Sequence, residues 1–452
     1  MNRSITPIPE KRLTFKIPEL KSIALANGIE VSFVRKEKLP IVYLEVIVFS
    51  GSRFDPANKK GLGYLMSMLI DEGADEYDAL QLNEEFEKLG SIFSVSANHD
   101  TIILSVLSLK ENFERSLELL SKIILQPRFD DKSFEREKNK DLSMILQLKD
   151  EPSFIASSAF EHRVFGDTYY GFPEIGFEET VSRITNNDIK DYFKKYFSAS
   201  NSKIVAVGNL DETETRDLLN KYFSKWNSVS GNEIIFNQPK RTKTNFYFVH
   251  KTDSAQSEIR IGHISKKLDT NDYIYARIMN TILGGQFSSR INLNLRENKG
   301  FTYGANSSFH YYKDSGLFEV STAVNIENTG AAIAEILKEL RGIRENISAG
   351  EIEFAKSYLI KQFPSRFETS IQVAKYLESL IIHSLPSDEL INYTKKLELA
   401  SDNEVIAAAL NNIFPDELVV VAVGDKEKVF DQLKNISGES PIELDIHGNV
   451  IT

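Results

Sequence analysis

Patterns of apolar and polar residues divide the first half of the chain into predicted strands and helices. Residues 30–34 alternate between the two kinds, and residues 41–49 are rich in β-branched and aromatic side chains, so both segments are predicted strands. Apolar residues at helical spacing from Phe113 to Ile124 predict an amphipathic helix that ends before Pro127. Further helices are expected over 61–72, 80–89, 133–147 and 152–165, and further strands over 92–107 and 204–207.

The second half of the chain repeats this order of elements. The run Val205-Ala206-Val207-Gly208 returns as Val421-Ala422-Val423-Gly424, and the helical trio Leu117, Leu120 and Ile124 returns as Ile333, Ile336 and Leu340, both 216 residues later. Two separate elements in register over the same distance indicate a duplicated domain, and the period is far too long for a solenoid.

The predicted fold class is therefore α+β, with two tandem homologous domains. Each domain is expected to contain a mostly antiparallel sheet with helices on one face. We place the domains at residues 1–226 and 244–452, joined by the polar, Gly- and Pro-containing linker 227–243. The polar tail from Ser437 onward is expected to lie on the surface.

Composition and charge narrow the class of protein. With 41% apolar and 26% charged residues the chain resembles an ordinary soluble globular protein, and its net charge of −11 favours neither nucleic acid nor an anionic membrane as partner. The absence of cysteine excludes disulfides, thiolate metal sites and Cys nucleophiles. The N-terminal stretch lacks an apolar core of signal-peptide length and no apolar run approaches a membrane span, so a cytoplasmic location is expected.

The stretch from Leu283 to Gly304 contains two residues that could carry chemistry. A turn at Gly284-Gly285 leads into a short helix that Gly300 is suited to end, and residues 301–303 are predicted to begin a strand. Arg296 would then lie on the last helical turn and face Tyr303 across a corner. A guanidinium can hold a carbonyl or carboxylate, and a phenol can donate to a developing oxyanion. On spacing alone, however, helix capping and packing are the more ordinary roles for this pair.

Other recognisable catalytic patterns are missing. None of the seven histidines lies three or four residues from another, so no helix presents two imidazoles to a zinc ion. The Gly284-Gly285 pair lacks the features of a phosphate-binding loop, and there is no G-x-S-x-G elbow. A Ser-His-Asp triad built from distant residues stays open at this point.

Several motifs occur in the order found in one family of peptidases. These are G-S-R-F-D-P and G-L-G-Y-L within 51–65, F-E-R-E-K at 134–138, F-G-D-T-Y-Y-G-F-P-E-I-G at 165–176, I-V-A-V-G-N at 204–209, L-G-G at 283–285 and L-R-E-N-K-G-F-T-Y-G at 295–304. With the internal duplication, they give the chain a resemblance to the pitrilysin/insulinase family of zinc peptidases, in the size class of mitochondrial processing peptidase and the bacterial heterodimeric peptidases. The resemblance implies that this chain is half of a clamshell.

The chain departs from this family at the metal. Active members carry His-x-x-Glu-His on the helix after the G-S-R segment, where the histidines bind zinc and the Glu activates water. The matching positions here hold Tyr64, Ser67 and Met68, and the third ligand falls at Met144, whereas Glu137, two turns earlier, is retained. These side chains do not replace two imidazoles and a carboxylate. The resemblance therefore implies no metal or other cofactor in this chain, and zinc in a partner subunit.

The other half of the family's machinery is present. By resemblance, Arg296 would hold a backbone carbonyl of the bound peptide and Tyr303 would stabilise the oxyanion of the tetrahedral intermediate. The predicted function is thus the non-zinc-binding subunit of a heterodimeric zinc metalloendopeptidase, with a homologous zinc-bearing subunit and a peptide substrate as partners. A structural or peptide-guiding core subunit is the alternative, and an independent hydrolase with unrelated chemistry is a third possibility.

Overall fold

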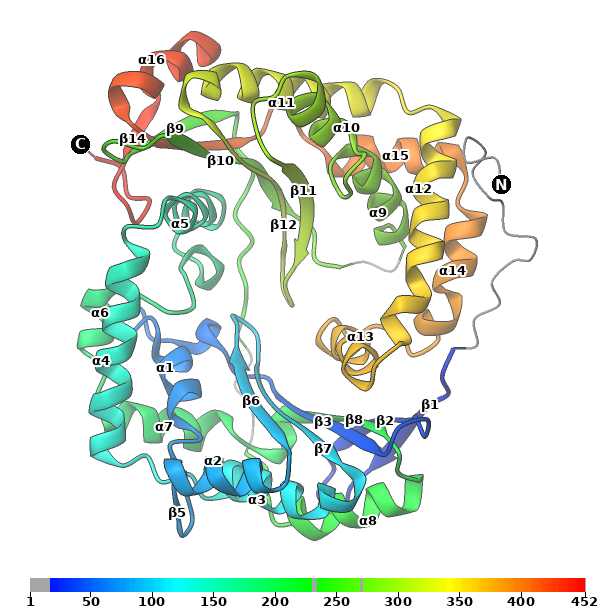
Figure 1. Cartoon of the computed structure of the whole chain (residues 1–452). Helices are drawn as coiled ribbons and strands as arrows, with labels where there is room; N and C mark the ends of the chain where they lie inside the picture. Colours follow the sequence, from blue (N-terminus) through cyan, green and yellow to red (C-terminus); the bar gives the residue numbers. More distant parts are fainter. Residues whose placement is uncertain (1–16, 230–233, 269–270, 452) are drawn as a thin grey trace.

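Two six-stranded sheets organise the chain (Figure 1). The computed structural model describes residues 17–229, 234–268 and 271–451. The first sheet has the order β1 (Leu20–Ala24), β2 (Glu30–Arg35), β8 (Ser202–Gly208), β3 (Ile41–Val48), β7 (Ile102–Leu109) and β6 (Ile92–Ala97). The second has the order β14 (Ile442–Leu444), β9 (Asn245–His250), β13 (Val419–Gly424), β10 (Gln256–Ser265), β12 (Gly316–Asn325) and β11 (Ala305–Tyr311). A two-residue ribbon pairs β4 (Gly73–Ala74) with β5 (Tyr77–Asp78).

Helices surround the two sheets. The first half contains α1 (Leu62–Leu69), α2 (Ala79–Lys88), α3 (Phe113–Leu125), α4 (Asp131–Leu148), α5 (Pro152–Phe165), α6 (Glu178–Ser182), α7 (Asn186–Tyr196) and α8 (Glu212–Phe223). The second half contains α9 (Tyr273–Leu283), α10 (Arg290–Asn292), α11 (Thr329–Glu345), α12 (Ala349–Gln362), α13 (Ser370–Ile382), α14 (Glu389–Leu399), α15 (Asp402–Asn412) and α16 (Lys426–Ser437). The helices and strands predicted for the first half are confirmed, with small shifts at their ends.

The duplication is also confirmed. Helix α15 begins and ends 216 residues after α7. The strands β9, β13, β10, β12 and β11 lie in the same order as β2, β8, β3, β7 and β6, whereas the edge strands β14 and β1 come from opposite ends of the chain. Both sheets are mixed but mainly antiparallel, since among the strands of the described residues only the pairs β2–β8, β9–β13 and β9–β14 are parallel. The fold is therefore two copies of one α+β arrangement. The boundaries at 226 and 244 stay a prediction: residues 230–233 of the proposed linker lie outside the described residues, and 234–243 contain no helix or strand.

One helix from each half packs on the sheet of the other half. Helix α5 packs against β10 and β13, and helix α13 packs against β3 and β8. In Figure 1 these two helices lie on the inner sides of the sheets, between the two halves. The strands are apolar on both faces because both faces are covered: in β3, Leu44 contacts the first-half core, whereas Tyr43 and Ile47 contact the second-half core.

An ion pair between a buried carboxylate and a half-exposed lysine joins α13 to β3. Glu45, in the middle of β3, is fully buried, and Lys375 of α13 binds it at 3.0 Å. The Tyr43 hydroxyl donates to the same carboxylate at 2.8 Å. A carboxylate inside an apolar strand needs such partners, so this contact favours the observed docking of α13.

The two ends of the chain differ in how far the structure describes them. The tail after Ser437 does not simply lie on the surface, since Ile442–Leu444 adds strand β14 beside β9 and Leu444 is buried. Its three-residue length left too little apolar pattern to predict a strand. The N-terminal residues 1–16 lie outside the described residues, and among the helices described none is long and apolar enough to cross a membrane.

Candidate functional site

The positions aligned with the family's zinc ligands do come together in space. Tyr64 on α1 and Met144 on α4 are 80 residues apart in sequence, and the phenol oxygen lies 4.0 Å from the thioether sulfur. Ser67 is turned back onto its own helix, where its hydroxyl donates to the Tyr64 carbonyl at 2.6 Å. Met68 is half-buried one residue further along. A phenol, a hydroxyl and two thioethers do not fit zinc, which takes imidazole, thiolate and carboxylate ligands.

No alternative metal cluster takes their place in the described ranges. Within 17–229, 234–268 and 271–451, no group of three or more His, Asp or Glu side chains is arranged to hold a metal ion. The retained Glu137 is buried and receives hydrogen bonds from Arg136 Nε at 3.1 Å and Lys140 Nζ at 3.2 Å. Glu137 is therefore part of an ion-pair network on α4.

Asp141 is a buried acid that the sequence reasoning did not single out. It lies one helical turn beyond Glu137 on α4, its side chain is 0% exposed, and neither of its carboxylate oxygens has a hydrogen-bond partner among the described residues. Burial, together with the Glu137 carboxylate, raises the pKa of Asp141 to about 7. Its place between Glu137 and Met144, at helical spacing on one face of α4, was the available sequence signal.

Replacing Asp141 by Asn is expected to remove a pH-dependent loss of stability. The folded protein holds the Asp141 proton more tightly than the unfolded chain, in which the pKa is about 3.9. This contribution to stability is complete below about pH 4 and is lost as the pH rises toward 7. Between pH 5 and pH 7, the parent should lose about 2 kcal/mol more unfolding free energy than Asp141→Asn. Urea unfolding at the two pH values measures the difference.

The exposed Asp191 on α7 offers a matched control. Asp191→Asn should leave the dependence of unfolding free energy on pH parallel to that of the parent. Parallel curves for Asp141→Asn and the parent would show that Asp141 ionises as an ordinary surface carboxylate, contrary to the argument from burial.

The purified chain is expected to retain no stoichiometric zinc after dialysis, because its residues at the ligand positions do not bind this metal. Elemental analysis measures the metal content. A variant that combines Tyr64→His, Met68→His and Met144→Glu is the positive control, since α1 and α4 still bring these positions together, and it should gain zinc. One tightly held zinc in the parent chain would contradict the prediction.

Arg296 lies in a helical segment that is wider than an α-helix. Helix α10 continues into a π-helical stretch over Leu293–Asn298. Gly300 then adopts a left-handed conformation with φ of 65°, and the Phe301 amide donates to the Leu295 carbonyl at 2.9 Å, which ends the helix as predicted. The Arg296 guanidinium carbon sits 4.4 Å above the ring of Phe287, and Nη1 lies 3.6 Å from Glu297. The guanidinium is thus held by a ring face and one weak ion pair.

Tyr303 projects into solvent. Its side chain is 92% exposed, and no hydrogen bond or ring contact joins it to another described residue, Arg296 included. The loop beneath it is fixed, because the Thr302 hydroxyl donates to the Ala323 carbonyl at 2.7 Å and accepts from the Gly304 amide at 3.0 Å. Packing therefore does not account for Tyr303.

The prediction that residues 301–303 begin a strand is wrong. Strand β11 begins at Ala305. The Phe301 amide donates to the Leu295 carbonyl at the helix end, and the Phe301 carbonyl accepts from the Asn325 amide at 3.2 Å. These bonds tie the segment to the helix and to the end of β12, so the pairing of β11 with β12 begins only at Ala305. The Ala305 amide itself faces away from β12 and donates to Asn292 Oδ1 at 3.0 Å.

The G-S-R and T-Y-Y motifs build a buried network between the halves. Arg53 binds Asp100 at 3.1 Å and Asp314, in the β11–β12 turn of the second half, at 2.6 Å. Tyr170 donates to Asp100 at 2.8 Å, and Tyr169 donates to Asp314 at 2.7 Å. These motif residues therefore hold the two halves together.

Comparison with known proteins agrees with this architecture. Residues 31–171 match the family described as "Insulinase (Peptidase family M16)", and residues 183–359 match the family described as "Peptidase M16 inactive domain". The chain belongs to the M16 peptidase family. A "Non-peptidase homolog YmxG" of Helicobacter pylori is 22% identical over 88% of this chain and 93% of its own length, and an "Uncharacterized zinc protease" of Rickettsia felis is 25% identical over 76% and 82%.

A solved M16 structure has the same fold. The crystal structure of a peptidase M16 inactive domain from Pseudomonas fluorescens superposes with a TM-score of 0.85 at 24% identity, covering 90% of this chain and 98% of that one. The M16 relatives thus carry names of both kinds, zinc protease and non-peptidase. The residues that occupy the ligand positions of this M16 chain decide what it can do.

Proposed function

We propose that this chain is the non-zinc-binding subunit of a heterodimeric zinc endopeptidase and supplies Arg296 and Tyr303 to the active site. The observation that carries the proposal is the 92% exposure of Tyr303 on a loop that is itself fixed. A large aromatic side chain that contributes nothing to its own fold is available to a partner or a substrate.

The two side chains suit complementary roles in peptide hydrolysis. The Tyr303 phenol is a single donor and would bind the oxyanion that forms on the scissile carbonyl. The Arg296 guanidinium, steadied over Phe287, would hold a neighbouring backbone carbonyl of the peptide in the ground state and the transition state alike. The zinc of the partner subunit would supply the activated water when bound there. Such a division of labour explains why only one subunit needs metal ligands.

The isolated chain is therefore expected to have no peptidase activity and to gain it on mixing with the zinc-bearing partner. An oxyanion donor without a metal-activated water lacks a nucleophile. Cleavage of a quenched fluorescent peptide library by each subunit and by the mixture measures this. Chelator-sensitive cleavage by the isolated chain, free of contaminants, would count against the proposal.

A structural or peptide-guiding subunit is the second candidate. It is supported by the Tyr64–Met144 contact at the positions that match the family's zinc ligands, because these side chains do not bind the metal that peptide hydrolysis needs. In that case the mixture would still assemble, but activity would not depend on Tyr303. The expected cytoplasmic location stays a prediction in either case.

A further inference from the structure

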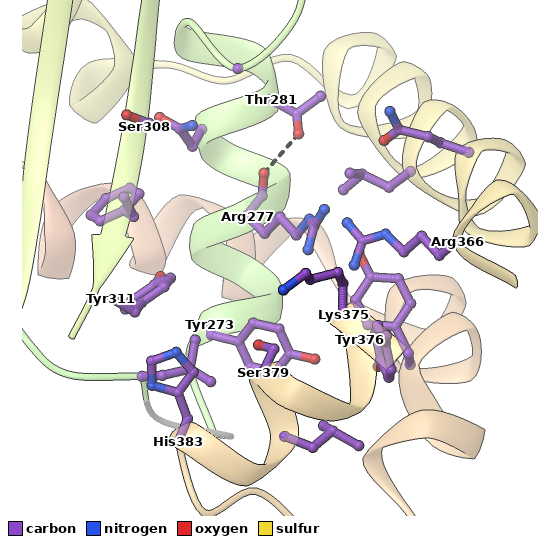
Figure 2. Close-up of a pocket in the computed structure, with 18 of the residues that line it drawn as sticks. Tyr273, Arg277, Thr281, Ser308, Tyr311, Arg366, Lys375, Tyr376, Ser379 and His383 are labelled. Atoms are coloured by element: carbon purple, nitrogen blue, oxygen red, sulfur yellow. Dashed lines mark hydrogen bonds between the residues drawn. The ribbon is translucent and has the colours of Figure 1, made fainter. Parts of the chain in front are cut away.

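A cavity of about 790 Å³ lies in the second half between β11, α9 and α13 (Figure 2). Neither Arg296 nor Tyr303 lines it. Among the described lining residues are Arg277, Arg366 and Lys375, whereas none is Asp or Glu. The lining itself carries three cations and no carboxylate, although Glu45 and Glu378 pair with Lys375 and the buried Glu389 accepts from the lining Tyr273 at 2.7 Å, so the uncompensated positive charge is that of the two arginines.

Two of these cations have no acidic partner. Lys375 binds Glu45 at 3.0 Å, but no carboxylate or other acceptor of the described residues binds the guanidinium of Arg277 or Arg366. Figure 2 shows Arg277 and Arg366 extending toward each other from different helices. Their guanidinium carbons lie 5.6 Å and 5.7 Å from the ring centre of Tyr393. Two guanidinium groups held near one ring repel each other, and an anion bound between them would stabilise the arrangement.

Tyr393 gives a second, independent indication of a ligand. It lines the cavity, its side chain is only 1% exposed, and its hydroxyl has no hydrogen-bond partner among the described residues. A buried donor without a partner costs about 1–3 kcal/mol, which an acceptor in the cavity would offset.

The wall formed by β11 offers backbone groups as well. This strand is the edge of its sheet. The outward amides of Ala305 and Ser307 already donate to Asn292 and to the Gly284 carbonyl, each at 3.0 Å. Alternate residues of a strand point their backbone groups to the same side, so those of Phe309 and Tyr311 also face outward, and no hydrogen bond from the described residues reaches them. Both residues line the cavity.

We propose that this cavity binds an acidic peptide segment in extended conformation, which pairs with the outer edge of β11 at Phe309 and Tyr311 and places carboxylates on Arg277 and Arg366. The strand edge supplies affinity for the peptide backbone, and the guanidinium pair selects acidic side chains. The site concerns this chain alone and does not depend on a zinc-bearing partner.

The test uses the purified full chain and a fluorescein-labelled decapeptide that alternates Glu and Thr, which places all carboxylates on one face of a strand. Fluorescence anisotropy should show saturable binding. The same peptide with Gln in place of Glu should bind at least about tenfold more weakly, and so should Glu–Thr peptides that are N-methylated at alternate residues, in both registers, to block strand pairing. Because these comparisons use the unaltered protein, they test the proposal even if a variant folds poorly.

Variants then assign the site. Arg277→Gln and Arg366→Gln should each weaken binding of the Glu–Thr peptide about ten- to hundredfold, the loss expected for one charge-assisted hydrogen bond. Arg344→Gln removes the same charge from α11, outside the cavity, and should leave binding within about twofold. Equal affinity for the Glu and Gln peptides, or no binding, would overturn the proposal. Unchanged binding of the N-methylated peptides, or equally tight binding of free glutamate, would reduce the cavity to a small-anion site without strand pairing.

Discussion

Replacing Arg53 by Met is expected to lower the free energy of unfolding by about 3–5 kcal/mol, the cost of leaving buried charges without their partner. Arg53 is only 7% exposed and forms ion pairs with Asp100 and Asp314, which come from different halves of the chain. Methionine has a similar length but no charge, so the two carboxylates would repel each other in a poorly hydrated space. Urea unfolding followed by fluorescence and circular dichroism measures the loss.

The location of the network adds a second expectation. Because α5 and α13 also join the two halves, Arg53→Met should lower the stability of both halves together and keep one unfolding transition. Arg35→Met is the matched control, since Arg35 pairs with Glu37 on the surface, and it should cost at most about 1 kcal/mol. A loss for Arg53→Met as small as that of the control would show that the network contributes little.

Tyr303→Phe in the assembled heterodimer is expected to lower kcat by about 10²–10³-fold, or roughly 2.7–4 kcal/mol. The exposed hydroxyl has no partner in the described fold, so its removal should not affect stability. If it binds the oxyanion, the interaction strengthens in the transition state and the effect falls on kcat. Steady-state kinetics with a quenched peptide and thermal unfolding of the same sample measure both properties.

Arg296→Ala should separate binding from turnover. A guanidinium that holds the peptide backbone in the ground state contributes to affinity, so this variant should also raise KM. Tyr222→Phe, on α8 of the other half, removes a phenol that contacts Glu114 at 3.4 Å and should leave the kinetics unchanged. Turnover by Tyr303→Phe within about threefold of the parent complex would favour the structural or peptide-guiding subunit.

The sequence by itself determined the elements of the first half, the duplication and the family. These follow from local periodicity and short motifs, which neighbouring residues specify without long-range contacts. It also aligned Tyr64 and Met144 with the family's ligand positions, and the structure brings these two residues, 80 apart in sequence, into contact. The helix end at Gly300 was predictable for the same reason, since a left-handed residue is a local requirement.

Only the tertiary structure decided how these elements pack against one another and which side chains become buried. The crossed packing of α5 and α13, the burial of Asp141 and the Arg53 network join residues from distant parts of the chain. The late start of β11 and the pairing of β14 also depend on partners far along the sequence. Exposure is a property of the assembled fold, so the sequence left Tyr303 open to a packing role, and the structure shows it in solvent. Local patterns fix which element a residue joins, whereas desolvation and pairing with distant groups fix what its side chain can do.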